Sequence, residues 1–472
     1  MPSISIDGSP VDNLCEEFEG QWWLAENESN KVPGRLTFSV PNGGRLILNG
    51  GLSRQDDYSR EFIILGDCKG IHITVNSGKY WGGSETSIED SWRIDEETWR
   101  CDEILIGGHI LEGREKTYGH FILETELLQD WIAKAHPTDN FNATTPSLSI
   151  EVPERIELQG QNGATIAIDW TVKHSNNGTN AVIMVSPRLE FNLQNGIVIS
   201  EFEKTFLIPF LFFISLATGS VDHLKFMTAR NETAEVATRT GNLQVLTTNW
   251  RRTRQTDRTY RVEHLIQFSE IEPILGERIN AWLRVFEART DTLSEYYSVP
   301  YSNEMYSDDT FARIVRSLES WHRESSSALG FVEASEYERI KEELKSKLDE
   351  NDSRIVLKKF NNSPDLRQRL EDLVASSTTK IKFIVSHSEA FLQKTVNTRN
   401  KIAHIGDARK VFNSSELFWA KMVLQQLFIS LILVEIGFEQ EMVANLLERT
   451  SDWKYLAFTV DWHAQPLSES FD

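Results

Sequence analysis

The spacing of the apolar residues changes along the chain, and this change limits the fold more than any other feature of the sequence. Over about the first 200 residues, short apolar runs alternate with turn signals, as in RLTFSV (35–40), PNGG (41–44) and RLIL (45–48). The Asn-Gly and Gly-Gly pairs supply the positive φ angles that tight hairpins need. A second hairpin is expected to join residues 164–174 to residues 179–187. Strands with this spacing predict a sandwich or barrel-like sheet.

Beyond residue 305 almost every segment has helical periodicity instead. The predicted helices run from Asp308 or Asp309 to Leu329, from Glu333 to Leu348, from Ser363-Pro364-Asp365 onward with Pro in the first turn, from Ser377 to Arg399, from Leu417 to Ile436 and from Glu439 to Arg449. The segment 300–303 is expected to be a linker. The predicted fold class is therefore α+β. A β-rich N-terminal region over residues 1–300, with subdomains 1–200 and 201–300, precedes an all-α bundle over residues 305–472.

The chain is expected to be cytoplasmic. Its first seven residues lack the basic and apolar regions of a secretion signal, and its three cysteines form neither a disulfide framework nor a zinc pattern. Residues 205–221 carry no charge, but Pro209 and Gly219 interrupt the segment. This segment predicts a buried core helix rather than a membrane span, and we expect no contact with a membrane.

The charge of the chain is strongly acidic, with a formal net charge of −21. Taken alone, this charge argues against a nucleic-acid-binding protein, because phosphate contacts need Lys and Arg. Residues 354–410, however, contain 12 basic and 5 acidic residues, a net charge of 12 − 5 = +7. The acidic total therefore hides a locally basic segment that could contact a polyanion.

Four arginines are followed by a histidine after four or five intervening residues, a pairing that can combine charge stabilisation with proton transfer. The pairs are Arg114/His120, Arg258/His264, Arg316/His322 and Arg399/His404. The spacing is weak as a signal, because chance alone gives about two such pairs. The first two pairs lie in the β-rich part, and the third is expected to face solvent on a helix. Only the fourth has an Asn directly after the Arg, lies in the basic segment and precedes a mostly apolar helix.

The residues around this fourth pair resemble a known family. Residues 391–404, FLQKTVNTRNKIAH, look like the signature of ApeA-type HEPN proteins. FEGQWWL (18–24) and VPGRLTF (32–38) resemble the start of the ApeA N-terminal domain. The signatures occur in the family's order and lie at both ends of the chain, whereas residues 100–300 match only by position. The resemblance implies a bacterial antiphage protein that acts by abortive infection through a HEPN ribonuclease domain.

Carried over residue by residue, the resemblance makes Arg399, Asn400 and His404 the catalytic residues. Histidine titrates near neutrality, which suits proton transfer from the attacking 2′-hydroxyl and to the leaving 5′-oxygen. Arg399 could bind two oxygens of the phosphorane with its planar fork, and Asn400 could hold the imidazole or the Arg by a hydrogen bond. The expected products are 2′,3′-cyclic phosphate and 5′-hydroxyl ends. No metal or other cofactor is expected.

The expected partners follow from this chemistry. One motif supplies one Arg and one His, so a homodimer or a higher even oligomer is expected to complete the centre, through residues 417–436 or the motif helix. The expected substrate is RNA, with tRNA anticodon loops favoured because loops expose unstacked bases. We expect the N-terminal region to restrain the enzyme until a trigger, such as a phage-encoded protein, is present.

A second basic stretch lies in residues 249–261, where several arginines accompany two aromatic residues. Such a stretch could follow a phosphate backbone while bases stack on its rings, or it could be a solvated hairpin that balances an acidic domain. The candidate RNA contacts are Arg251, Arg252 and Arg254 in this stretch, and Lys394 and Lys401 beside the motif.

Two other functional hypotheses stay open. The helical region could be a catalytically inert HEPN module that serves dimerisation or partner binding, beside a ligand-binding β-domain. Alternatively, the Trp-rich N-terminus could bind a sugar or a peptide, with the helices serving oligomerisation. The presence of Arg399, Asn400 and His404 together favours the ribonuclease.

Overall fold

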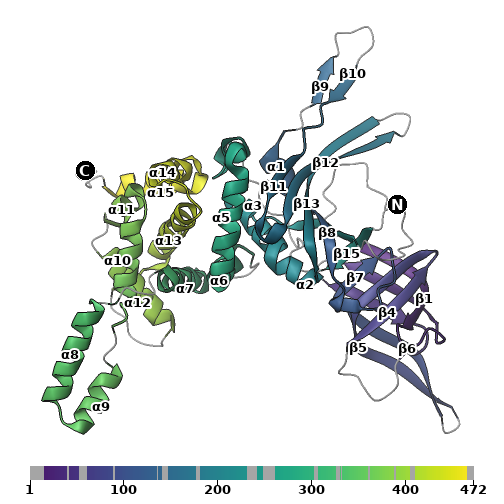
Figure 1. Ribbon diagram of the computed structural model, residues 1–472, viewed down its shortest axis with the longest axis horizontal. Helices are drawn as coiled ribbons and strands as arrows, with labels where there is room; N and C mark the ends of the chain where they lie inside the picture. Colours follow the sequence, from purple (N-terminus) through teal and green to yellow (C-terminus); the bar gives the residue numbers. More distant parts are fainter. Residues whose placement is uncertain are drawn as a thin grey trace, which may run out of the picture. The chain divides into compact units, whose positions relative to one another are not determined.

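The computed structural model (Figure 1) describes residues 15–39, 42–52, 61–88, 91–134, 137–140, 147–176, 181–230, 242–247, 261–301, 307–325, 330, 332–359, 362–386, 390–403 and 410–464. The chain forms two compact units, residues 1–261 with 266–280 and residues 262–265 with 281–472. A β-rich region is followed by a helical one, which confirms the α+β class. The domain limits expected from the sequence, 1–300 and 305–472, stay a prediction.

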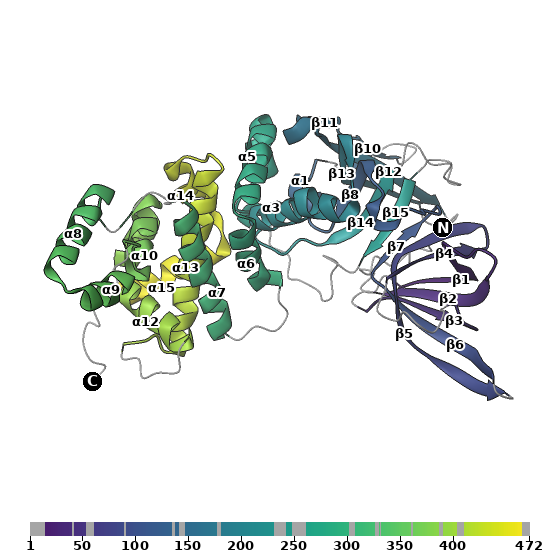
Figure 2. The same cartoon turned by 60° about the horizontal axis from the view of Figure 1, so that its bottom comes forward.

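Six strands of the first unit close into an antiparallel barrel in the order β5–β4–β1–β2–β3–β6, and β6 pairs back with β5 (Figure 2). The strands are β1 (Cys15–Leu24), β2 (Val32–Ser39), β3 (Gly43–Leu48), β4 (Phe62–Cys68), β5 (Ile71–Ile88) and β6 (Ser91–Cys101). The β2–β3 register, with Ser39 opposite Gly43, confirms the first predicted hairpin. Inside the barrel, Trp22, Phe38 and Trp99 are fully buried.

The sheet continues beyond the barrel as an open antiparallel layer, in the order β11–β12–β13–β8–β14–β15–β7–β5. The added strands are β7 (Glu103–Ile106), β8 (Tyr118–Thr125), β11 (Ile156–Gln159), β12 (Thr165–Asn176), β13 (Ala181–Ile197), β14 (Leu224–Arg230) and β15 (Asn242–Thr247). The pairing of Asn176 with Ala181 confirms the second predicted hairpin. A separate small sheet pairs β9 (Pro137–Asn140) with β10 (Ser147–Ile150).

Short helices cover one face of this open layer (Figure 2). They are α1 (Leu128–Ile132), α2 (Ile199–Phe202), the π-helical turn η3 (Glu203–Leu207) and α3 (Ile208–Thr218). Every residue of α3 after the first is buried, which confirms the predicted core helix. The Phe202 ring stacks on Phe121 of β8, with centroids 3.7 Å apart, and meets Phe191 of β13 edge-on at 5.2 Å. Because successive strand residues alternate between faces, Phe121 points to the helices while its neighbour Ile122 points away.

The chain also forms short helical turns in and directly after the first unit, and α5 carries it across the boundary between the two units. The elements are η1 (Gly113–Glu115), η2 (Gln161–Gly163), η4 (Arg261–Glu263), α4 (Phe268–Ile271), η5 (Glu272–Ile274) and α5 (Leu275–Ala288).

The second unit is a helical bundle. Its helices are α6 (Thr290–Tyr301), α7 (Ser307–Ser325), α8 (Ala334–Lys347), α9 (Glu350–Lys359), α10 (Leu366–Ser376), α11 (Thr379–Ser386), α12 (Phe391–Ala403), α13 (Ser414–Glu435), α14 (Gln440–Arg449) and α15 (Ser451–Ala464). Helix α13 is central, because α7, α10, α11, α14 and α15 all contact it (Figure 1). It buries Leu424, Leu427, Phe428 and Ile432, and Gly437 with φ 95° ends the segment, as the sequence predicts.

Within the described part of the chain, α13 is the one helix with the length and apolar composition to cross a membrane. Of its most apolar window, 61% is buried inside the bundle. The central helix of a soluble bundle meets the same test, so this composition is weak evidence for a membrane span.

Three sequence predictions about the helices need correction. Pro300 and Tyr301 belong to the last turn of α6 rather than to a linker, since Pro300 gives up only one backbone bond there and Tyr296 and Tyr297 are buried. Pro364 precedes α10, whose N-cap is Asp365 with Oδ1 accepting from the Gln368 N–H at 2.8 Å. The predicted helix 377–399 is two helices, α11 and α12, and the hydroxyl of Ser386, the last residue of α11, donates to the Phe383 carbonyl.

Candidate active site

Helix α12 carries the predicted motif, and its inner face is fixed by burial. Phe391, Thr395 and Thr398 are buried, and their spacing of four and three residues places them on one side of the helix. Asn400 and Lys401 are exposed, and the Arg399 side chain is 27% exposed. The same helix therefore packs on the bundle and presents polar groups to solvent at its last turn.

The first half of α12 is tied to the start of α13. Lys394 Nζ lies 2.7 Å from Glu416 Oε1. Glu416 also forms a reciprocal capping box with Asn413, in which each side chain accepts the other's backbone N–H at 2.9 Å. The hydrogen bond from Lys394, followed by the Asn413 N–H, lowers the pKa of the Glu416 carboxyl. Lys394 is therefore engaged within the protein rather than free for a ligand.

The Arg399 guanidinium has two neighbours that accept hydrogen bonds. Its Nη1 lies 3.4 Å from Asn400 Oδ1, and its Nη2 lies 3.4 Å from Glu319 Oε2 on α7. Glu319 is only 14% exposed, and its other oxygen accepts from Arg323 one turn further along α7. A guanidinium has five N–H donors, so Arg399 retains donors that can bind a phosphoryl oxygen.

The other predicted site residues are placed as follows. His404 lies outside the described residues, as do Arg251, Arg252 and Arg254. Lys401 is exposed one residue after Asn400. Sequence reasoning missed Glu319, because it lies 80 positions before Arg399 and no local pattern marks it.

The rival pair on α7 has a structural role. Arg316 binds Glu295 at 2.7 Å. His322 is 3% exposed, and its Nε2 lies 3.0 Å from Asp372 Oδ2 on α10. The expectation that this pair faces solvent is therefore wrong for His322, which joins α7 to α10. In the β-rich unit, Arg114 binds Glu61 and Ser77.

Clusters of metal ligands were also sought. Across the described ranges, no group of three or more His, Cys, Asp or Glu side chains is placed to hold a metal ion.

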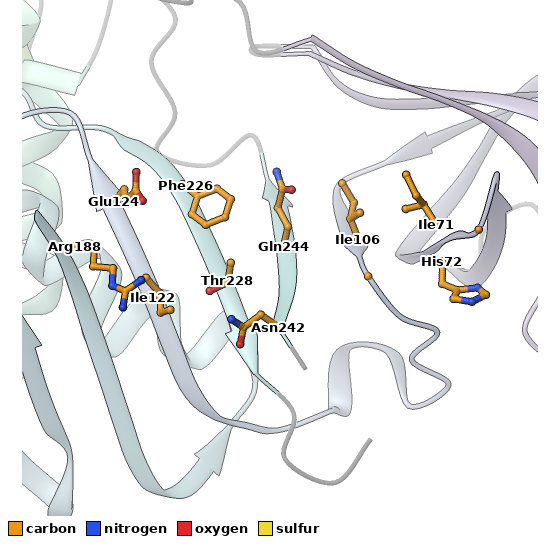
Figure 3. Close-up of a pocket in the computed structure, with 12 residues that line it drawn as sticks. Ile71, His72, Ile106, Ile122, Glu124, Arg188, Phe226, Thr228, Asn242 and Gln244 are labelled. Carbon is orange, nitrogen blue, oxygen red and sulfur yellow. The ribbon is translucent and has the colours of Figure 1, made fainter. Parts of the chain in front are cut away.

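A second candidate site lies on the open layer of the first unit. A cavity of about 460 Å³ is lined by residues in or next to β13, β8, β14, β15, β7 and β5 (Figure 3). Alternation within the strands explains its lining, since Ile122 and Glu124 face it while Phe121 and Leu123 are buried on the other side. The remaining lining residues are Gly70, Ile71, His72, Ile106, Gly107, Arg188, Phe226, Thr228, Asn242 and Gln244. The lining of this cavity thus combines apolar, amide and charged side chains.

Comparison with known proteins gives two matches. The family model of ApeA N-terminal domain 1 matches residues 17–282, and that of the Apea-like HEPN domain matches residues 313–442, which include Glu319, Arg399 and Asn400. Searches of curated proteins and of solved structures found no match. HEPN domains are generally ribonucleases, so the second unit carries a nuclease-type module, and its pairing with the ApeA domain points to antiphage defence. Because the first match alone covers more than half of the 472 residues, the chain belongs to the ApeA family of HEPN proteins.

Proposed function

We propose that this protein is a metal-independent endoribonuclease that defends a bacterial population by cleaving host RNA and so aborting phage infection. The observation that supports it most directly is the placement of Arg399. Its guanidinium is partly exposed on the last turn of α12, beside exposed Asn400 and Lys401, while the buried face of the helix holds the turn in place. A fixed and accessible guanidinium is the group that a phosphoryl transition state requires.

The reaction assigns one role to each motif residue. Arg399 binds the oxygens of the phosphorane, on which negative charge develops. His404 transfers protons between the 2′-hydroxyl, which attacks, and the 5′-oxygen, which leaves. Asn400 accepts from Arg399 and limits its rotation, in keeping with the 3.4 Å contact between them. The products are a 2′,3′-cyclic phosphate and a 5′-hydroxyl.

The centre is completed by a second copy of the chain in this proposal. A single motif carries one histidine, whereas the reaction uses both an acid and a base. The N-terminal half of α13 offers an interface, since Phe418 is 45% exposed and the neighbouring Trp419 stacks on Tyr455 at 4.9 Å. Phe418→Glu is expected to give a monomer by light scattering and to lose cleavage. Phe383→Glu, which charges another exposed ring, is the matched control.

The proposed substrate is structured RNA, with tRNA anticodon loops as the first candidate. Loop nucleotides are unstacked and flexible, so their 2′-oxygen can align with the scissile bond. The net charge of +7 over residues 354–410 favours a polyanion at this part of an otherwise acidic chain.

The experiment compares RNA cleavage by the full chain, Arg399→Ala and His404→Ala in the presence of EDTA. We expect cleavage by the unchanged chain to persist, with the predicted end groups found by RNA sequencing. Loss of one transition-state contact is expected to lower the rate about 100- to 1,000-fold. Arg316→Ala, from the pair with the same kind of spacing, serves as control. Equal cleavage by Arg399→Ala and the unchanged chain would falsify the assignment.

The cavity of the first unit favours a second function, ligand-dependent control. Its mixture of apolar groups with Asn242, Gln244 and Arg188 is typical of sites that bind and orient a ligand. In this proposal the β-rich unit binds the trigger, and the helical unit cleaves RNA. Thr228→Trp would fill the cavity, so we expect it to abolish phage protection while leaving unchanged the basal RNA cleavage by the purified chain without a trigger.

A further inference from the structure

The carboxylate of Glu319 contacts the predicted catalytic arginine from a different helix. Glu319 Oε2 lies 3.4 Å from Arg399 Nη2, and its side chain is only 14% exposed. The two residues are 80 positions apart, so the contact depends on how α7 packs on α12. A surface glutamate that met the arginine by chance would be far more exposed.

The position of Glu319 is itself fixed by its neighbours. Its second oxygen, Oε1, accepts from Arg323 Nη2 one turn later on α7. The adjoining residues Leu318 and Trp321 are buried in the bundle. His322 binds Asp372 at 3.0 Å, and Gln368 donates to the other oxygen of Asp372 at 2.9 Å, which joins α7 to α10. Glu319 is therefore a rigid anchor for a guanidinium.

The rotamer entropy of an arginine side chain corresponds to about 2 kcal/mol. Part of this entropy is lost when the guanidinium is ordered against a phosphoryl group. Asn400 contacts only one of the two terminal nitrogens of the Arg399 guanidinium, Nη1. Glu319 restrains the other end, at Nη2. These two contacts use at most two of the five N–H donors, so the remaining donors can still bind phosphate oxygens.

We propose that Glu319 is a positioning residue of the ribonuclease, which holds the Arg399 guanidinium in the orientation that cleavage requires. This inference rests on the proposed function. Glu319 touches neither the RNA nor the reacting atoms in this role. Its negative charge also opposes the phosphate backbone, so the same contact that raises the turnover rate weakens RNA binding.

The two effects of Glu319 separate in two variants. Glu319→Gln keeps an oxygen acceptor for Arg399 and removes the charge, so kcat is expected to stay within about twofold while KM falls about threefold. Glu319→Ala removes the acceptor as well, so kcat is expected to fall about 10- to 100-fold because the guanidinium is no longer aligned. A merely structural role would not produce a lower KM together with an intact kcat.

The test measures kcat and KM for the full chain and both variants on one labelled RNA stem-loop. Asp309→Asn, which removes one negative charge from an exposed position in the first turn of α7, is the matched control. Thermal unfolding of each variant shows whether the bundle is intact.

The outcomes distinguish this inference from the proposed function. Loss of activity in Glu319→Ala, with recovery in Glu319→Gln, supports positioning. If Arg399→Ala is inactive but Glu319→Ala cleaves like the unchanged chain, the positioning role is overturned and the ribonuclease stands. An inactive but folded Glu319→Gln also overturns it, because a proton-transfer role would then fit better. If Arg399→Ala cleaves normally, both proposals are overturned.

Discussion

The hydroxyl of Thr398 accepts a hydrogen bond from the backbone N–H of Phe412 at 3.0 Å. Thr398 lies in the last turns of α12, and Phe412 directly precedes Asn413, the N-cap of α13. The Phe412 ring also lies 5.6 Å from the Phe391 ring, between centroids. The end of the motif helix is therefore fixed to the start of the central helix. In the sequence, these two ends flank the segment that contains His404.

Thr398→Val is expected to destabilise the bundle and to lower RNA cleavage. Valine keeps the shape of threonine but leaves the partly buried Phe412 N–H without its acceptor, which is expected to cost about 1 kcal/mol. Urea unfolding followed by circular dichroism measures the change. Thr398→Ser retains the hydroxyl and should unfold close to the unchanged chain. If the valine and serine variants unfold at the same urea concentration, the bond does not stabilise the fold.

The sequence was informative wherever the determinants of structure are local. The Asn-Gly and Gly-Gly turn between β2 and β3, the apolar length of α13 and the αL glycine Gly437 each depend on a few adjacent residues, and all were predicted. The motif helix α12 begins 14 residues later and ends four residues later than the predicted helix 377–399. Its start depends on the tertiary contacts of Phe391 with Phe412, which periodicity does not reveal.

Contacts between residues far apart in the chain could not be predicted from the sequence. Strand β8 pairs with β13 and β14, which follow it by 56 residues or more, and no turn signal specifies these partners. The same holds within the site. Arg399 and Asn400 were found through their motif, whereas Glu319 meets Arg399 only because α7 and α12 pack together. A polar neighbour supplied by another helix has no signature in the motif that it serves.

Arg289 is expected to stabilise the helical unit more than an exposed arginine does. It is 7% exposed, and it binds Glu324 at 3.3 Å, Glu435 at 3.1 Å and Ser325 Oγ at 2.8 Å, with the Trp321 ring 4.2 Å away. Its partners Glu324 and Glu435 are 33% and 42% exposed, so loss of the buried guanidinium and its hydrogen bonds is expected to cost about 2–3 kcal/mol. Arg289→Ala should therefore lower the urea midpoint strongly. Arg316→Ala breaks the more exposed pair with Glu295 and should cost about 1 kcal/mol or less. Similar losses in both variants would contradict this assignment.

Asp222 is expected to make the first unit less stable as the pH rises. Its carboxyl is fully buried, with Oδ1 accepting from the Leu127 and His223 N–H groups, and burial raises its pKa to about 7. The unfolded carboxyl titrates near 3.9, so the folded state binds the proton more tightly. The stabilisation from this proton is therefore complete below about pH 4 and is lost as the pH approaches 7, about 4 kcal/mol in total.

Asp222→Asn removes this titration while retaining an oxygen acceptor. The free energy of unfolding of the variant, relative to that of the unchanged chain, is expected to rise between about pH 4 and pH 7. Glu338→Gln, at an exposed position on α8, controls for the general loss of a carboxylate. Urea unfolding at several pH values provides the measurement, and parallel curves for Asp222→Asn and the unchanged chain would show that the group does not titrate in this range.

Lys401 and Lys394, seven residues apart on α12, are expected to differ in their effect on RNA binding. Lys401 is exposed beside Arg399, whereas Lys394 is 27% exposed and held by Glu416 at 2.7 Å. A lysine that contacts phosphate displaces a counterion, so Lys401→Ala should reduce the slope of log affinity against log salt by about 0.7. Lys394→Ala should leave this slope unchanged and instead destabilise the start of α13. Fluorescence anisotropy with a non-cleavable 2′-O-methyl RNA, at several KCl concentrations, measures both slopes. An equal reduction in the two variants would mean that Lys394 leaves Glu416 to bind RNA, and no reduction in either would place the RNA backbone away from the outer face of α12.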